Sequence, residues 1–264
     1  MKLKSLLFFL LFITLKLSAC RCGSGNIAQE YFDADLIGII TVTKTFDGSI
    51  KANGDHKYDN YKAKIDFNQI IKGQKVNFLN VFGAKDKGIN DYQGCSLALN
   101  SGEKYLVILK KDQNNEYWVD LCSRMILLSY HNSIDEENEI INRYINLFKN
   151  LEKYKNQFYD LKFEKFYDLS EKRITYPYTP HTEFIKLNIS QPSEKLGIYK
   201  VFTDKNNKIK KIIPIKKIGE KDKKIEQLIL KNLEIDRPHR DENKYKESLL
   251  LLYFDDFEHF SLKF

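Results

Sequence analysis

Short apolar runs separated by turn signals fill residues 34–122 of the chain. In one run apolar Tyr61, Ala63 and Ile65 alternate with polar residues, which is the period of a half-buried β-strand. Five such runs predict strands at 36–46, 61–71, 76–82, 104–109 and 117–121. No helical period lies between them, which indicates a small barrel or a sandwich rather than a parallel α/β sheet. Of these we expect a five-stranded Greek-key barrel.

A change of period after residue 130 predicts a long amphipathic helix within 131–160. Ser133 and Glu136 form a capping box, in which the hydroxyl accepts from the Glu136 amide and the Glu136 carboxylate reaches back. Apolar residues then recur at helical spacing: Ile141, Tyr144, Ile145, Phe148, Leu151 and Phe158. We expect this face to pack on the protein's own barrel.

The rest of the chain predicts a second, smaller module. Residues 161–196 are aromatic and interrupted by proline, and we interpret them as a connecting region. Beyond them, residues 197–264 predict a β-β-α-β order, with strands at 198–203, 209–216 and 249–254 and a helix at 221–233. This module loosely resembles the carboxy-terminal module of TonB-type periplasmic proteins. The fold class is therefore mainly β with an α+β part.

The first 19 residues have the three parts of a secretory signal peptide. Lysines at the start precede an apolar run of eleven residues, Ser5–Leu15, and small residues end the segment before Cys20. The run is well short of the roughly 20 residues that span a bilayer. We expect the mature chain to begin at Cys20, as an exported protein of the extracellular space or periplasm, with a barrel domain at 20–130.

Two fates of Cys20 remain open. The residues before it, Leu17, Ser18 and Ala19, match a bacterial lipobox, which would lipidate Cys20 and anchor the protein in the outer membrane as a lipoprotein. Cleavage by an ordinary signal peptidase would instead leave Cys20 with a free amine and thiol. Four cysteines (20, 22, 95, 122) could then form two disulfides, whereas lipidation leaves an odd number.

Composition and charge exclude several classes of protein. A hydrophobic content of 42% and an aromatic content of 13% fit a folded globular chain and argue against disorder. The net charge is +7, but loss of the signal peptide leaves 40 basic and 36 acidic residues. Residues 197–233 hold 11 lysines and 4 acids, interleaved with core-type Ile and Leu, and we interpret them as a solvated surface. A nucleic-acid partner is therefore not expected.

Enzymatic chemistry is not indicated. The five histidines are scattered, and the chain has no H-x-x-x-H, G-x-S-x-G, P-loop or G-x-G-x-x-G motif. We therefore predict a binding protein without a cofactor or an intrinsic metal.

The most informative feature is Cys20-Arg21-Cys22 at the expected mature amino terminus. Together with segments that follow in order, it looks like the amino-terminal domain of tissue inhibitors of metalloproteinases (TIMPs) and the wider netrin-like modules. The resemblance covers about residues 20–126 and rests on Cys20–Cys22, Ala34–Gly38, Ile70–Gly73, Gly94–Leu97, Gly102–Val107 and Leu121–Cys122. It implies an OB-type barrel and the disulfides Cys20–Cys95 and Cys22–Cys122, while the third disulfide of the family domain is absent.

The resemblance also implies a mode of binding. A free amine and the carbonyl oxygen of Cys20 would chelate the catalytic zinc of a metalloproteinase. Arg21 would enter the S1′ pocket, where the family usually has a small or apolar residue. The remaining protease contacts would come from Cys22, Gly23, Gln93, Gly94 and Cys95.

A second function stays open beside inhibition. Lipidation would acylate the Cys20 amine and prevent zinc chelation. The barrel would then be an interaction scaffold of a lipid-anchored envelope protein, because a fold does not fix a function.

Overall fold

A computed structural model describes the chain in eleven segments: 25–47, 51–53, 56–58, 60–83, 96–129, 133–169, 173–175, 187, 196–219, 221–236 and 246–253. The described residues form two compact units. Unit 1 comprises residues 38–125, and unit 2 comprises residues 25–37 together with 126–253. The predicted signal peptide, residues 1–19, lies outside the described residues.

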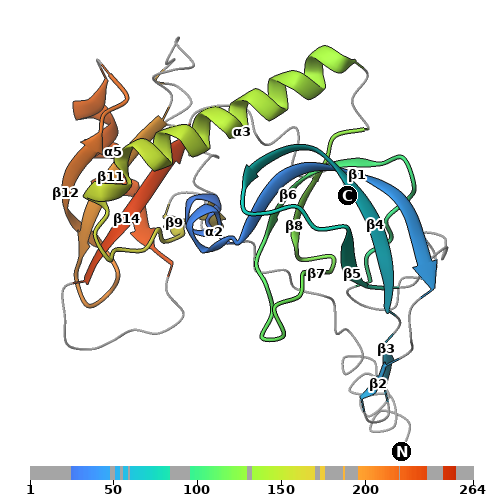
Figure 1. Ribbon diagram of the computed structural model, residues 1–264. Coiled ribbons are helices and arrows are strands. Elements are labelled where there is room, and N and C mark those ends of the chain that lie inside the picture. Colours follow the sequence, from blue (N-terminus) through green and yellow to red (C-terminus); the bar gives the residue numbers. More distant parts are fainter. Residues whose placement is uncertain are drawn as a thin grey trace, which may run out of the picture. The chain divides into compact units, whose positions relative to one another are not determined.

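A six-stranded sheet curls into a half-barrel (Figure 1) and lies in unit 1, apart from residues 36–37 and 126–127 at two strand ends, which fall in unit 2. Its strands are β1 (Leu36–Asp47), β4 (Asn60–Lys72), β5 (Phe78–Phe82), β6 (Lys104–Leu109), β7 (Trp118–Val119) and β8 (Arg124–Leu127). They are ordered β7-β5-β4-β1-β6-β8. A separate hairpin pairs β2 (Lys51–Asn53) with β3 (His56–Tyr58).

The alternation seen in the sequence explains how this sheet buries one face. Along β4, Tyr61, Ala63 and Ile65 are buried, whereas Lys62 and Lys64 between them are exposed. Four of the five predicted strands are present with ends within two residues of the prediction. The fifth, predicted at 117–121, is only the two-residue strand β7. It pairs in parallel with β5, and the turn at 120–123 ends it.

Unit 2 contains the remaining helices and strands. Its helices are α2 (Ile27–Asp33), α3 (Ile134–Tyr154) and α5 (Asp222–Asn232), with the 3-10 turn η3 (Lys155–Gln157) after α3. Its strands are β9 (Phe166–Asp168), β10 (Arg173–Thr175), β11 (Leu196–Thr203), β12 (Ile209–Lys216), β13 (Leu233–Ile235) and β14 (Lys246–Tyr253). They form two antiparallel sheets, β10-β9-β13 and β12-β11-β14.

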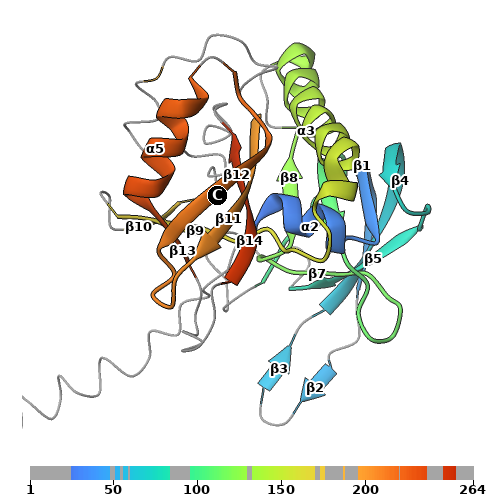
Figure 2. The same ribbon diagram turned by 90° about the vertical axis from the view of Figure 1, so that its left-hand side faces the viewer.

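The predicted β-β-α-β elements are present as β11, β12, α5 and β14, but the short strand β13, which was not predicted, lies between α5 and β14. Helix α5 packs on one face of the β12-β11-β14 sheet (Figure 2). Tyr199 and Val201 of β11 meet Ile225 and Ile229 of α5 in the core between them, and all four are fully buried. The hairpin turn is set by Asp204, whose carboxylate accepts from the amides of residues 206 and 208.

Helix α3 begins where its cap predicts. The Ser133 hydroxyl accepts from the Glu136 amide at 3.2 Å, as expected. The buried face is centred on Tyr144, Phe148 and Leu151, but it is completed by residues 140 and 147. Ile141 and Ile145, predicted on this face, are only half-buried. The buried face of α3 is therefore rotated about the helix axis, by a fraction of a turn, from the face that the sequence predicts.

Two features of unit 2 were not anticipated. One is α2, a seven-residue helix directly after the predicted protease-contact segment. The other is the β10-β9-β13 sheet, which lies partly within the predicted connecting region. The coarse prediction, a mainly β protein with an α+β part, agrees with the structure.

Candidate functional site

Most predicted site residues lie outside the described residues: Cys20, Arg21, Cys22, Gly23, Gln93, Gly94 and Cys95. Each predicted disulfide, Cys20–Cys95 and Cys22–Cys122, includes at least one of them, so both pairings remain predictions. Cys122 is described. The structure also describes the residues that follow each predicted contact segment in the chain.

The segment after Cys22 enters a capped helix in unit 2. Asn26 is the N-cap of α2, and its side-chain oxygen accepts from the Ala28 amide at 3.0 Å. The amide nitrogen of the same side chain donates to the Glu164 carbonyl oxygen at 2.9 Å. Asn26 is only 4% exposed, so both bonds are shielded from water. The Asn26 side chain thus caps α2 and also links its start to Glu164, which lies more than 130 residues later in the chain.

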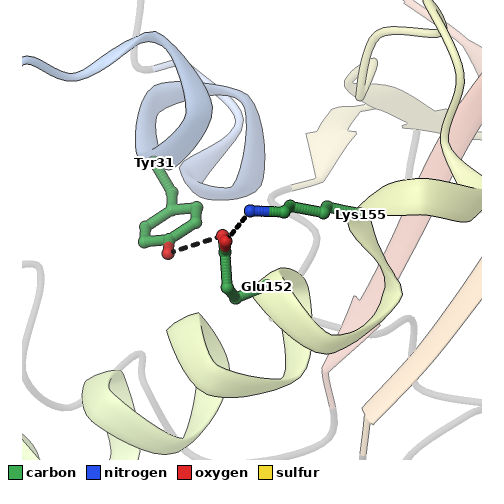
Figure 3. Close-up of polar contacts among 3 residues, drawn as sticks. All are labelled: Tyr31, Glu152 and Lys155. Atoms are coloured by element: carbon green, nitrogen blue, oxygen red, sulfur yellow. Dashed lines mark hydrogen bonds and ion pairs between the residues drawn. The ribbon is translucent and has the colours of Figure 1, made fainter.

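Two further polar contacts hold α2 in unit 2. The Phe163 amide donates to the side-chain oxygen of Gln29 at 2.9 Å. The Tyr31 hydroxyl donates to a carboxylate oxygen of Glu152 on α3 at 3.2 Å, and Lys155 forms an ion pair with the same carboxylate (Figure 3). Glu152 is therefore shared between a neutral donor from α2 and a cation from the end of α3.

Tyr31 is buried, and this changes its ionisation. Burial, followed by the negative charge of Glu152 and the hydrogen bond to it, raises the pKa of Tyr31 from 10.0 to about 12. All three effects oppose a phenolate, because a second negative charge would lie beside the carboxylate in a poorly solvated place. Tyr31 is thus a neutral hydrogen-bond donor at every physiological pH.

Aromatic rings complete the attachment of α2. The Tyr31 ring stacks on Phe148 of α3 with 4.8 Å between ring centres. Phe32 contacts Phe158 edge-to-face at 5.6 Å and lies parallel to Phe163 at 6.2 Å. Such pairs contribute about 0.5–1.5 kcal/mol each beyond their buried area. The helix is therefore bound to unit 2 on both its polar and its apolar sides.

The segment after Cys95 is tied to the sheet of unit 1. The Leu97 amide donates to the Phe82 carbonyl at 2.9 Å. The hydroxyl of buried Tyr61, on β4, accepts from the Leu99 amide at 2.7 Å and donates to the Leu97 carbonyl at 3.2 Å. A single tyrosine hydroxyl therefore satisfies two backbone groups of this segment.

Cys122 lies in a turn organised by Asp120. The Cys122 amide donates to a carboxylate oxygen of Asp120 at 2.9 Å. The Ser123 hydroxyl donates to the same oxygen at 2.9 Å and accepts from the Asp120 amide at 2.9 Å. The turn thereby holds Cys122 at an exposed position, with the amides of Asp120, Cys122 and Ser123 hydrogen-bonded.

Asn26, Tyr61 and Asp120 were not singled out from the sequence. Asn26 before Ile27 is a helix-cap signal. The helix that follows has only seven residues, which is too short to show a helical periodicity in the sequence. Asp120 with Ser123 is a turn signal of the same kind. Nothing in the sequence marks Tyr61 apart from its place in an alternating strand.

No group of acidic, histidine or cysteine residues suited to a metal ion is present in the described part of the chain. In that same part, no helix is both long and apolar enough to cross a membrane.

The sequence matches no family model and no curated protein.

Proposed function

We propose that this chain is an exported, TIMP-like binding protein that inhibits a zinc metalloendopeptidase through its mature amino terminus. The observation that carries the proposal is the position of Cys20-Arg21-Cys22 directly after a signal-peptide pattern. A residue at a free amino terminus offers its α-amine and its carbonyl oxygen as two zinc ligands, and here that residue would be Cys20. Bound there, they would displace the water that the protease activates.

We propose further that unit 1 is an OB-type Greek-key barrel. Four strand pairings support this. Strand β1 lies between β4 and β6, so the chain crosses over between β5 and β6. Strand β7 runs parallel to β5 at one edge of the sheet, and β8, separated from β7 by four residues, borders β6 at the other edge. β7 and β8 thus resemble one interrupted fifth strand that links both edges of a five-stranded barrel.

The described supports suit a rigid contact surface. Tyr61 holds the residues that follow Gln93, Gly94 and Cys95, and Asp120 holds Cys122, the proposed partner of Cys22. With the two proposed disulfides formed, little freedom would be left to lose on binding. Pre-ordering of this kind improves affinity by lowering the entropic cost of association.

Arg21 determines which proteases fit. Its side chain is long and permanently charged, so a purely apolar S1′ pocket would bury an unpaired guanidinium at a cost of several kcal/mol. The expected target therefore has a deep S1′ pocket with an acidic or polar end.

A second function is favoured by the lipobox at residues 17–20. If Cys20 carries a diacylglyceryl group and an acylated amine, the protein is an envelope lipoprotein whose barrel is an interaction scaffold. Both functions predict export, and they differ in the chemistry of one residue.

Intact mass of the exported protein separates the two functions. The inhibitor predicts the mass of residues 20–264 less four hydrogens, with an α-amine that reacts with amine reagents. An added lipid mass with a blocked amine would eliminate inhibition and leave the scaffold.

A further inference from the structure

We infer that the β11–β12 hairpin of unit 2 binds an anionic membrane surface. This binding goes beyond the proposed inhibition and does not depend on the chemistry of Cys20. It is carried by a group of lysines around one aromatic ring and one exposed apolar side chain, which we call the hairpin patch. The members of the hairpin patch are Lys200, Phe202, Lys205, Lys208, Lys211 and Ile213.

Strand pairing places the centre of the hairpin patch on the sheet face opposite α5. Val201 packs in the core against α5, which covers one face of the sheet (Figure 2). Because side chains alternate along a strand, Lys200 and Phe202 on either side of Val201 lie on the other face. On β12, Ile213 pairs with Lys200 and Lys211 pairs with Phe202. Cross-strand partners share a face, so these four side chains are neighbours.

The hairpin patch presents charge and apolar surface together. The Nζ atoms of Lys200 and Lys211 lie 5.2 and 5.1 Å from the centre of the Phe202 ring, so two ammonium groups share one ring. Ile213 beside them is 41% exposed. Farther along β11, Ile198 on the same face is fully buried. The face is therefore covered at one end and exposed at the hairpin patch.

Lysines outnumber acids around the hairpin patch. Residues 200–211 and 246–247 contain six lysines and two acids, Asp204 and Glu247. Both acids form ion pairs, with Lys210 and Lys200 respectively. A third acid, Glu234 of β13, bridges to the hairpin through its backbone. The exposed lysines of the patch that form no ion pair with a described residue are Lys205, Lys208 and Lys211.

This combination suits a lipid surface better than a single bound anion. Several lysines spread over a hairpin match an array of phosphate headgroups, and each lysine near an anionic bilayer strengthens binding about fivefold. Lysine stems can lie along apolar surface while their ammonium groups stay at the headgroups. Ile213 adds an apolar contact with the acyl boundary, which a soluble polyanion does not offer.

The test measures binding of the full mature chain, with Cys20 unlipidated, to sedimented vesicles. The vesicles contain phosphatidylcholine with about one third phosphatidylglycerol, in about 0.1 M salt, and pure phosphatidylcholine is the neutral reference. We expect Lys205→Gln/Lys211→Gln to lower the partition coefficient about twentyfold. The matched control, Lys223→Gln/Lys224→Gln, removes the same charge from exposed positions of α5 and should lower it about twofold or less.

Ile213→Ser separates a membrane from a soluble polyanion. It removes an exposed apolar contact and no charge, so we expect it to lower vesicle binding about threefold or more. Binding of dextran sulfate, measured in parallel, should stay the same in this variant. Thermal unfolding of all variants should match the wild type, because each substituted side chain is exposed.

The possible contrary results point to different errors. Equal binding of the wild type to anionic and neutral vesicles, or to neither, would show that the hairpin patch binds no anionic membrane. Equal losses from the two pairs of lysine substitutions would assign the binding to overall charge. Vesicle binding that Ile213→Ser leaves unchanged would make the patch a site for soluble polyanions instead. None of these results bears on zinc endopeptidase inhibition, which is measured separately.

Discussion

At Tyr31 one hydroxyl links the amino-terminal helix to α3, and its raised pKa makes the link testable by pH. The unfolded chain loses this proton near pH 10, whereas the folded chain keeps it to about pH 12. Between these values the folded state binds more protons, so the free energy of unfolding contributed by Tyr31 falls as pH rises. Below pH 10 the contribution is fully present.

We predict that Tyr31→Phe lowers the free energy of unfolding of unit 2 by about 1 kcal/mol at pH 7, through the lost hydrogen bond. The variant should also lose less stability than the wild type between about pH 10 and 12, a range set by the two pKa values. Urea unfolding at several pH values measures both effects. Tyr159→Phe, at an 81% exposed position, is the control and should follow the wild type. A Tyr31→Phe curve parallel to the wild-type curve would contradict the raised pKa.

Gly83 directly follows β5, and the backbone of Leu97 passes close to it. Its φ is +150°, and a Cβ there would lie 2.6 Å from the Leu97 amide nitrogen and closer still to the Leu97 carbonyl oxygen. Both are backbone atoms, so they cannot move aside as a flexible side chain would.

We predict that Gly83→Ala destabilises unit 1 by about 1–3 kcal/mol more than Gly102→Ala does. Gly102 also has a positive φ, +92°, but a Cβ there meets nothing within 4 Å, so that variant reports the backbone strain alone. Thermal unfolding of the two variants provides the comparison. Equal losses would mean that the close approach to Leu97 contributes nothing.

On the scale of elements, α3 depends on its N-cap residue, Ser133. Ser133 caps the helix with its hydroxyl, and acids at 135, 136 and 137 occupy the positive end of the helix dipole. We predict that Ser133→Ala costs about 1 kcal/mol and that Ser133→Asp retains most of the stability. Urea unfolding followed by circular dichroism measures both. If Asp were as damaging as Ala, the cap would not be what stabilises this end.

Elements with a long, regular pattern could be predicted from the sequence. The alternation through Tyr61, Ala63 and Ile65 placed β4, and Ser133 placed the start of α3. The two-residue strand β7 ended early because Asp120 and Ser123 close a turn, a local hydrogen-bonding preference that competes with strand pairing. The ends of short strands are decided by such contacts rather than by periodicity.

Attachments between distant residues could not be predicted. Helix α2 is too short to be stable alone, and its contacts come from residues 148–164, more than 110 positions later. Strand β9 likewise depends on its pairing with β13, which lies far along the chain. Its three residues are too few to show the alternation of a strand in the sequence. The four cysteines were read from the sequence by position and number, and their pairing remains a prediction.

On the scale of the whole molecule, positive charge is concentrated rather than general. Residues 197–233 alone carry a net charge of +7, which equals the net charge of the whole chain, so the remaining residues sum to zero. Some of these lysines interact with neighbours within unit 2. The Nζ atoms of Lys200 and Lys211 lie 5.2 and 5.1 Å from the centre of the Phe202 ring, and Lys200 also forms an ion pair with Glu247. This arrangement supports the interpretation of a solvated lysine-rich surface in the free protein.

The central claim is that a free Cys20 amine ligates the zinc of a target protease. The decisive measurement is inhibition by the mature chain beginning at Cys20, compared with the same chain carrying one alanine before Cys20, against zinc endopeptidases of the thermolysin and matrix metalloproteinase types. We predict inhibition that weakens in acid below the amine pKa of about 7.7–8.0, and a loss of about a hundredfold on adding the alanine, which turns the amine into an amide. Equal inhibition by both proteins, or inhibition by neither, would contradict the claim.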